Sequence, residues 1–212
     1  MSGPNSIQAL MGLVPVIPVL TLEDPSWAAP LAKVLVAAGL RVLEVTLRTP
    51  TALEAIAEMT KVEGAIVGAG TIKDVDSLEA ARKAGARFAV SPGLTDSVAE
   101  AAKAAGMAFL PGVATASEIL RGLELGLTAF KFFPAEAAGG IKALSALAAP
   151  FSEARFCPTG GVTAASAPAW LALPSVLCVG GSWIARSGDD LATVEQRARQ
   201  AAALTRAHPA TP

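Results

Sequence analysis

Short runs of apolar and β-branched residues alternate with alanine-rich stretches along most of the chain. The apolar runs predict buried strands, and the alanine-rich stretches, with their polar positions on one face, predict helices packed against them. We expect strands at residues 14–20, 41–47, 64–70, 87–90, 107–112, 128–133, 155–159 and 176–180. We expect helices at residues 25–38, 51–60, 75–84, 95–105, 115–125, 139–148, 164–172 and 190–206.

Turn and capping residues mark the boundaries between these elements. A glycine follows each of several helical stretches and is expected to adopt the left-handed conformation that ends a helix, at Gly39, Gly85, Gly106 and Gly126. Prolines fall where strands should end, because proline cannot donate to a sheet ladder. Capping boxes, in which a Ser or Thr is followed three residues later by Glu, are expected at Thr51 to Glu54 and at Thr115 to Glu118.

The order of elements gives eight units of one strand followed by one helix. Such a series closes into a (β/α)8 TIM barrel, and 212 residues leave little room for a second domain. We therefore expect residues 1–212 to form a single barrel domain with a frayed tail from about residue 207. The competing fold is a doubly wound open sheet, which would need fewer strands or larger insertions.

Composition and charge restrict the expected cellular location of the protein and the kinds of partner it could bind. The chain is 52% hydrophobic and 17% charged, with a net charge of −1 and no cluster of basic residues. Nucleic-acid binding and attachment to an anionic membrane surface are therefore not expected. The first residues resemble neither a signal peptide nor a membrane span. Cys157 and Cys178 lie in apolar runs typical of buried thiols, which favours a cytoplasmic protein.

Two absences restrict the chemistry. The sequence has no tyrosine, and its one histidine, His208, lies in the expected tail. A histidine-ligated metal site, a Ser-His-Asp triad and a histidine general base are thus all disfavoured. Acid–base chemistry must fall to Glu, Asp, Lys or water, and we expect no metal and no cofactor.

The strand expected at 41–47 contains a carboxylate. Alternation along the strand directs Glu44, Thr46 and Arg48 to one face, which we assign to the barrel interior. A buried carboxylate is costly unless it is paired or used in catalysis. The structural alternative is that Glu44 forms an ion pair with Arg48 or Arg155.

Lys131 lies in the aromatic run FKFFPAE, within the strand expected at 128–133. A closed barrel offers no edge strand on which this amine could be solvated. Burial disfavours a charged ammonium and favours the neutral amine, the form that attacks a ketone to form an imine. The alternatives are that the side chain extends to solvent or makes a static pair with Glu44.

Two Gly-Gly pairs follow the last two expected strands, in PTGGVTAAS and VGGSWIA. Bare backbone amides can approach an anion closely, and a helix start after each pair would favour negative charge. Barrels often bind phosphate after strands 7 and 8, so a phosphate site is expected here. The alternative is that the glycines only form tight turns.

Taken together, several motifs resemble one enzyme family. The segments EVTLRT, VGAGT, VSPG, FKFFPAE, RFCPTGG and CVGGSW resemble, in order and spacing, the bacterial 2-keto-3-deoxy-6-phosphogluconate (KDPG) aldolases, which also act on 4-hydroxy-2-oxoglutarate (KHG). The likeness covers about residues 10–186. It implies a metal-free class I aldolase that yields pyruvate and glyceraldehyde 3-phosphate, and a homotrimer.

The resemblance also implies roles at the matching positions. Lys131 would form the Schiff base and Glu44 would be the general acid and base. Arg48 and Thr71 would bind the pyruvyl carboxylate, and Thr159 would help to set stereochemistry at C4. The remaining substrate-binding residues expected are Pro92, Phe133, Gly160, Gly161, Gly180, Gly181 and Ser182. Of these, Gly161, Gly181 and Ser182 would receive the phosphate.

Three other functions stay open at this stage. One is an isomerase, epimerase or decarboxylase of phosphosugars that uses Lys131 without forming an imine. Another is an aldolase for the galactonate epimer of the substrate. The third is a non-catalytic sensor that retains only the anion site.

Overall fold

The computed structural model describes residues 6–207. Its strands are β1 (Val16–Leu20), β2 (Val42–Thr46), β3 (Ile66–Gly70), β4 (Phe88–Val90), β5 (Ala108–Leu110), β6 (Gly112–Val113), β7 (Ala129–Phe132), β8 (Arg155–Pro158) and β9 (Val179–Gly181). Its helices are α1 (Ile7–Leu13), η1 (Pro25–Trp27), α2 (Ala28–Ala37), α3 (Ala52–Thr60), α4 (Val75–Lys83), α5 (Asp96–Ala104), α6 (Ala116–Glu124), α7 (Gly140–Ala148), α8 (Ala167–Leu171) and α9 (Leu191–Ala202).

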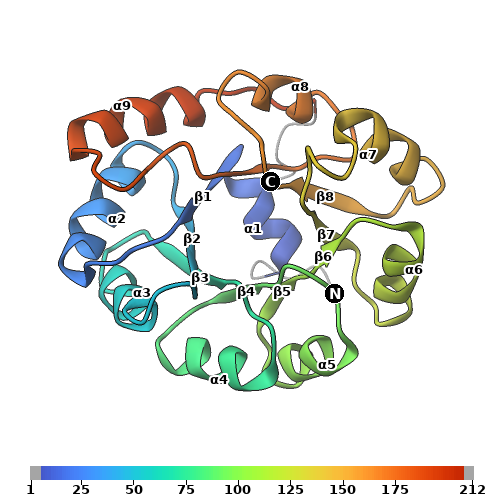
Figure 1. Cartoon of the computed structure of the whole chain (residues 1–212), viewed down its shortest axis with the longest axis horizontal. Helices are drawn as coiled ribbons and strands as arrows, with labels where there is room; N and C mark the ends of the chain where they lie inside the picture. The colour runs from blue at the N-terminus through green and yellow to red at the C-terminus, as the bar shows by residue number, and fades with distance from the viewer. Residues whose placement is uncertain (1–5, 208–212) are drawn as a thin grey trace.

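The strands form two parallel sheets. One has six strands in the order β5-β4-β3-β2-β1-β9, and the other has three in the order β6-β7-β8. Strands consecutive in sequence lie side by side from β1 to β5, without the reversal of strand order that a doubly wound sheet would show. The strands surround a central core, and α2 to α9 lie outside them (Figure 1). All carboxyl ends within each sheet therefore face one side of the molecule.

The strand expected at 107–112 is interrupted at Pro111, between β5 and β6. Proline has no N–H for the ladder, although its carbonyl accepts a hydrogen bond of 2.8 Å from the Lys131 N–H. Gly112 passes so close to Pro92 that a Cβ there would overlap the Pro92 carbonyl. The interruption thus lets the chain change sheets.

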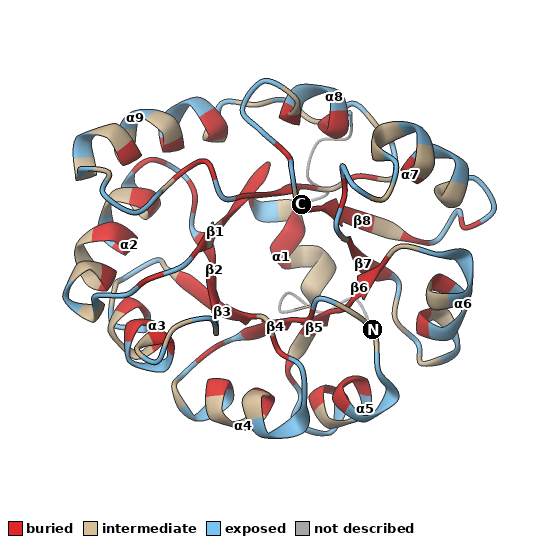
Figure 2. Ribbon diagram, in the orientation of Figure 1, coloured by how far each residue is buried: buried red, intermediate tan, exposed pale blue. Residues whose placement is uncertain are grey.

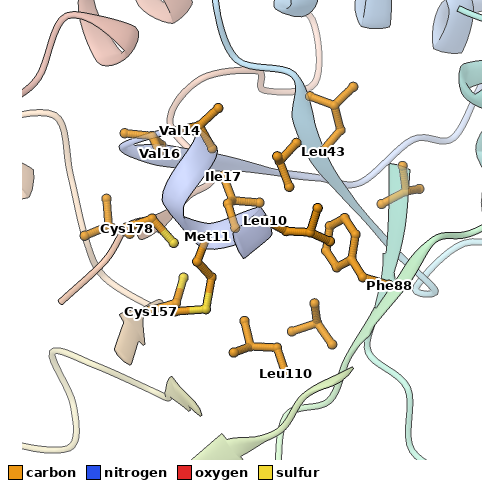
Figure 3. Packing of buried hydrophobic residues seen from close by; sticks show 14 of the residues in the cluster. Leu10, Met11, Val14, Val16, Ile17, Leu43, Phe88, Leu110, Cys157 and Cys178 are labelled. Carbon is orange, nitrogen blue, oxygen red and sulfur yellow. The ribbon is translucent and has the colours of Figure 1, made fainter. Parts of the chain in front are cut away.

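Helix α1 was not among the elements predicted from the sequence. The Ser6 hydroxyl caps it by accepting a hydrogen bond from the Ala9 N–H, at 3.2 Å. Leu10 and Met11 extend from this helix into the buried cluster that contains Phe88 (Figure 3). The helix therefore covers part of the core between the strands.

The capping signals are only partly confirmed. All four predicted glycine caps have positive φ, between 64° at Gly106 and 98° at Gly39, and Thr115 and Glu118 form the expected capping box. The box predicted at Thr51 is wrong, because Thr51 already has helical backbone angles and its hydroxyl donates to the Leu22 and Glu23 carbonyls. The Thr51 hydroxyl thus holds the loop after β1 against the start of α3.

The chain beyond α9 is held at least as far as Ala207. The Ala207 N–H donates to the Leu171 carbonyl at 3.0 Å, and an Arg206 guanidinium N–H donates to the Gly12 carbonyl at 2.8 Å. The helix expected to reach residue 206 ends at Ala202, and fraying from about residue 207 stays a prediction. The rest of the expected tail, including His208, lies outside the described residues.

The strands that surround the core consist mostly of buried residues (Figure 2). Cys157 and Cys178 are both free and buried, as expected, and burial raises the pKa of the Cys178 thiol well above its usual range. Trp170, in α8, is fully buried. Within residues 6–207, no helix is long and apolar enough to cross a membrane.

Candidate active site

Lys131 and Glu44 meet inside the ring of strands. Lys131 comes from β7 and Glu44 from β2, and the amine Nζ lies 3.2 Å from carboxylate Oε1. Both residues are buried, with exposures of 5% and 3%. Of the partners considered for Glu44, the structure selects Lys131, and neither Arg48 nor Arg155 pairs with it among the described residues. An amine and a carboxylate at this distance can exchange a proton directly.

Gly70 makes room for the Glu44 carboxylate. Gly70 is the residue opposite Thr46 in the β2–β3 pair, and a Cβ on it would overlap Glu44 Oε1 and approach Cδ and Cγ to 2.8 Å. Gly68, two residues earlier on the same face, leaves space for Phe88 in the same way. Neither glycine was predicted to matter from the sequence, although glycines at alternate positions of a strand indicate close approach by neighbouring groups.

We expect Gly70→Ala to reduce turnover by roughly 10²-fold, the cost of about 1 Å of misplacement in a reacting group. The added methyl group would push the carboxylate away from the Lys131 amine. The measurement is kcat, alongside circular dichroism to show that the fold is kept. Gly12→Ala is the control, because nothing lies within 4 Å of a Cβ at Gly12; equal kcat in both variants would refute this reading of Gly70.

Phe133 and Thr159 follow the ends of the neighbouring strands β7 and β8. The Phe133 ring centroid is 5.3 Å from Lys131 Nζ, within the range of a cation–π contact. Thr159 is buried directly after β8, and its hydroxyl donates to the Cys157 carbonyl at 3.3 Å. The parallel pairing of β7 with β8 aligns Phe132 with Pro158, so both residues follow paired strand ends.

Arg48 does not lie where the sequence predicted it. Strand β2 ends at Thr46, and Arg48 lies in the following turn, where it is exposed. Its N–H donates to the Thr46 carbonyl at 2.8 Å, which turns the chain. The strand alternation used to place Arg48 inside the barrel therefore does not reach this residue, which lies at the rim of the site instead.

Thr71 has φ of 64°, the one non-glycine residue with positive φ in the described chain. A β-branched residue in this region is strained, at a cost of about 1–3 kcal/mol. It follows Gly70 at the carboxyl end of β3 and is partly exposed. Strain of this kind collects at functional sites.

The two Gly-Gly pairs lie at strand ends, as expected, but without adjacent helices. Gly160 and Gly161 have φ of 98° and 82°, which only glycine adopts readily. Helix α8 begins at Ala167 and α9 at Leu191, so neither helix starts directly after a glycine pair. The predicted helix-dipole contribution is wrong, and loop amides alone remain available to bind an anion.

Ser182 and Pro92 complete the predicted set. Ser182 is exposed directly after β9, and Pro92 is exposed two residues after β4. The predicted residues therefore lie within β2, β7 and β9 or just after β2, β3, β4, β7, β8 and β9, toward the carboxyl ends of parallel strands.

The family model described as KDPG and KHG aldolase matches residues 7–197. The chain belongs to the KDPG and KHG aldolase family. Its sequence is 54% identical to a 2-dehydro-3-deoxy-phosphogluconate aldolase of Zymomonas mobilis, over 96% of this chain and 98% of the relative. It is 51% identical to the KHG/KDPG aldolase of Escherichia coli K12, over 85% of each chain.

A solved structure of this aldolase family adds a chemical observation. The KDPG aldolase of Legionella pneumophila is 39% identical and superposes with a TM-score of 0.90, covering 95% of this chain and 99% of its own. It holds pyruvate captured at low pH as a covalent carbinolamine intermediate.

Two cavities of about 480 and 500 Å³ flank the loop after β9. The larger is bounded by the loop after β1 and by Ser182, the smaller by Thr163, Trp183 and Arg197. Lys131 and Glu44 line neither. No group of three or more His, Cys, Asp or Glu within residues 6–207 could hold a metal.

Proposed function

We propose that this protein is a class I aldolase that cleaves 2-dehydro-3-deoxy-6-phosphogluconate to pyruvate and glyceraldehyde 3-phosphate. It would also cleave 4-hydroxy-2-oxoglutarate to pyruvate and glyoxylate. The observation that carries this proposal is the buried contact of 3.2 Å between Lys131 and Glu44. Family membership and the names of both relatives support it.

In the first half of the reaction, Lys131 is the nucleophile. Its neutral amine attacks the C2 ketone and forms a carbinolamine, the species captured with pyruvate in the Legionella relative. Glu44 takes one proton from the Lys131 ammonium, which frees the amine for attack, and gives it to the ketone oxygen. It then moves a second proton from the nitrogen to the hydroxyl, which leaves as water. The product is a protonated imine, an electron sink that needs neither metal nor cofactor.

In the second half, Glu44 is the base. It takes the proton of the C4 hydroxyl, the C3–C4 bond breaks, and its electron pair moves into the imine to give an enamine. The aldehyde leaves, the enamine gains a proton at C3, and water releases pyruvate from Lys131. The short Glu44–Lys131 contact lets one carboxylate serve both proton transfers.

The other predicted residues bind the ends of the substrate. Arg48 and Thr71 hold the pyruvyl carboxylate, Pro92 and Phe133 enclose the pyruvyl part, and Thr159 sets stereochemistry at C4. The phosphate binds to the backbone amides of the loop after β8 and of the end of β9, and to the Ser182 hydroxyl. This grouping is supported by the positions of these residues at parallel strand ends and by the strained backbone at Thr71.

The same proposal includes a closed (β/α)8 barrel that forms a single domain. The parallel bridge between Thr159 and Gly180 supports closure between β8 and β9. Closure between β5 and β6 is supported by the short gap between these strands, which are separated by one residue, Pro111. We further propose a homotrimer in the cytoplasm, where free thiols such as those of Cys157 and Cys178 persist.

The test is pyruvate release from each of three substrates: the phosphorylated gluconate-derived keto acid, its galactonate epimer and 4-hydroxy-2-oxoglutarate. We expect the highest kcat/KM for the first and measurable release from the third. Faster cleavage of the epimer would reassign the substrate. Failure to release pyruvate from all three would exclude an aldolase and leave the isomerase or sensor functions.

A further inference from the structure

The segment that follows Lys131 is tied by its backbone to the Gly160–Gly161 loop. The Ala135 N–H donates to the Thr159 carbonyl at 2.8 Å, and the Glu136 N–H donates to the Gly160 carbonyl at 3.0 Å. These bonds follow the parallel pairing of β7 with β8. The shape of the glycine loop therefore depends on the position of Glu136.

The Glu136 side chain, although the residue is exposed, also lies against the loop. A Cβ on Gly161 would lie 2.6 Å from Glu136 Cγ and 2.7 Å from Glu136 Cβ, closer than real side-chain contacts allow. The methylene groups of Glu136 and the bare Gly161 backbone are thus in direct contact. This contact requires glycine at position 161 independently of its positive φ.

A buried donor holds the Glu136 carboxylate in place. Glu136 Oε1 accepts a hydrogen bond of 3.0 Å from Trp170 Nε1. Trp170 is fully buried in α8 and its ring centroid lies 6.2 Å from that of Phe132, the residue after Lys131. A buried indole N–H needs an acceptor, so the bond fixes both side chains and directs the charge toward α8.

We propose that Glu136 is a positioning residue for the phosphate end of the substrate, an inference that rests on the proposed function. Its backbone and methylene groups hold the Gly160–Gly161 loop in the shape that presents amides to the phosphate. Its bond to Trp170 keeps the carboxylate from turning toward the phosphate, which it would repel. It acts through the loop and takes no part in imine chemistry.

The test compares a phosphorylated and an unphosphorylated substrate. Glu136→Ala should raise KM for the phosphorylated keto acid by about 10- to 100-fold, the range of one lost charge-assisted hydrogen bond. Its kcat/KM for 4-hydroxy-2-oxoglutarate, and the trapping of pyruvate on the enzyme by borohydride, should stay at the wild-type level. Glu136→Gln retains an oxygen for Trp170 and should bind the phosphorylated substrate nearly as the wild type does.

Trp170→Phe gives a second, independent readout, because it keeps an aromatic ring but loses the N–H. It should raise KM for the phosphorylated substrate alone. Equal losses on both substrates in Glu136→Ala and Trp170→Phe, or no loss on either, would overturn the positioning role. Failure of the proposed function is distinguishable, since the wild-type enzyme itself would then release no pyruvate.

Discussion

Replacing Lys131 by methionine is expected to reduce kcat/KM for pyruvate release by roughly 10⁴-fold or more, the scale on which loss of a covalent nucleophile acts. Methionine keeps the length and apolar contacts of the side chain but has no amine to attack the ketone. The measurement is initial rate against substrate concentration, with circular dichroism to establish folding.

Lys103→Met is the matched control for this variant. Lys103 lies in the last turn of α5 and is exposed, so its loss should leave kcat/KM unchanged. Substantial activity in a folded Lys131→Met protein would mean that the reaction does not pass through an imine on this residue.

Glu44→Gln is expected to lower kcat by about 10²- to 10⁴-fold, the range of a general acid–base group. Glutamine has the shape of glutamate and can still accept a hydrogen bond from Lys131, but it cannot carry a proton. Because the amine remains, the variant should still form the covalent pyruvate adduct, more slowly than the wild type. This separates it from Lys131→Met, which should form none.

The control for Glu44→Gln is Glu54→Gln, an exposed change in the first turn of α3. It should leave both kcat and the rate of adduct formation at wild-type values. If Glu44→Gln retained wild-type kcat, a different residue or water would be the base.

The sequence predicted the alternation of strands and helices because the pattern of apolar residues and glycine caps is local. What it missed depends on tertiary contacts. Helix α1 follows from a single cap at Ser6 and from packing of Leu10 and Met11 against the core. The strand is interrupted at Pro111 because the chain passes from one sheet to the other there. The Thr51 hydroxyl does not cap α3 because it donates to carbonyls of the loop after β1.

In the candidate site, too, features set by local sequence were predicted and features set by tertiary contacts were not. Alternation and strand ends indicated Glu44, Lys131 and the glycine loops as separate features. Their contact was only one of the alternatives that the sequence left open, since Glu44 and Lys131 come from strands in different sheets. The supporting residues Gly70 and Glu136 act only through contacts with distant parts of the chain. The predicted helix dipoles failed because α8 and α9 start several residues beyond the glycine pairs.

The most direct measurement of the central claim is covalent trapping. The protein is incubated with pyruvate and borohydride, digested, and analysed by mass spectrometry. The account predicts one reduced pyruvyl group on the peptide that carries Lys131, present in Glu44→Gln and missing in Lys131→Met. An unmodified Lys131 in the wild-type protein, or an adduct on another lysine, would contradict it.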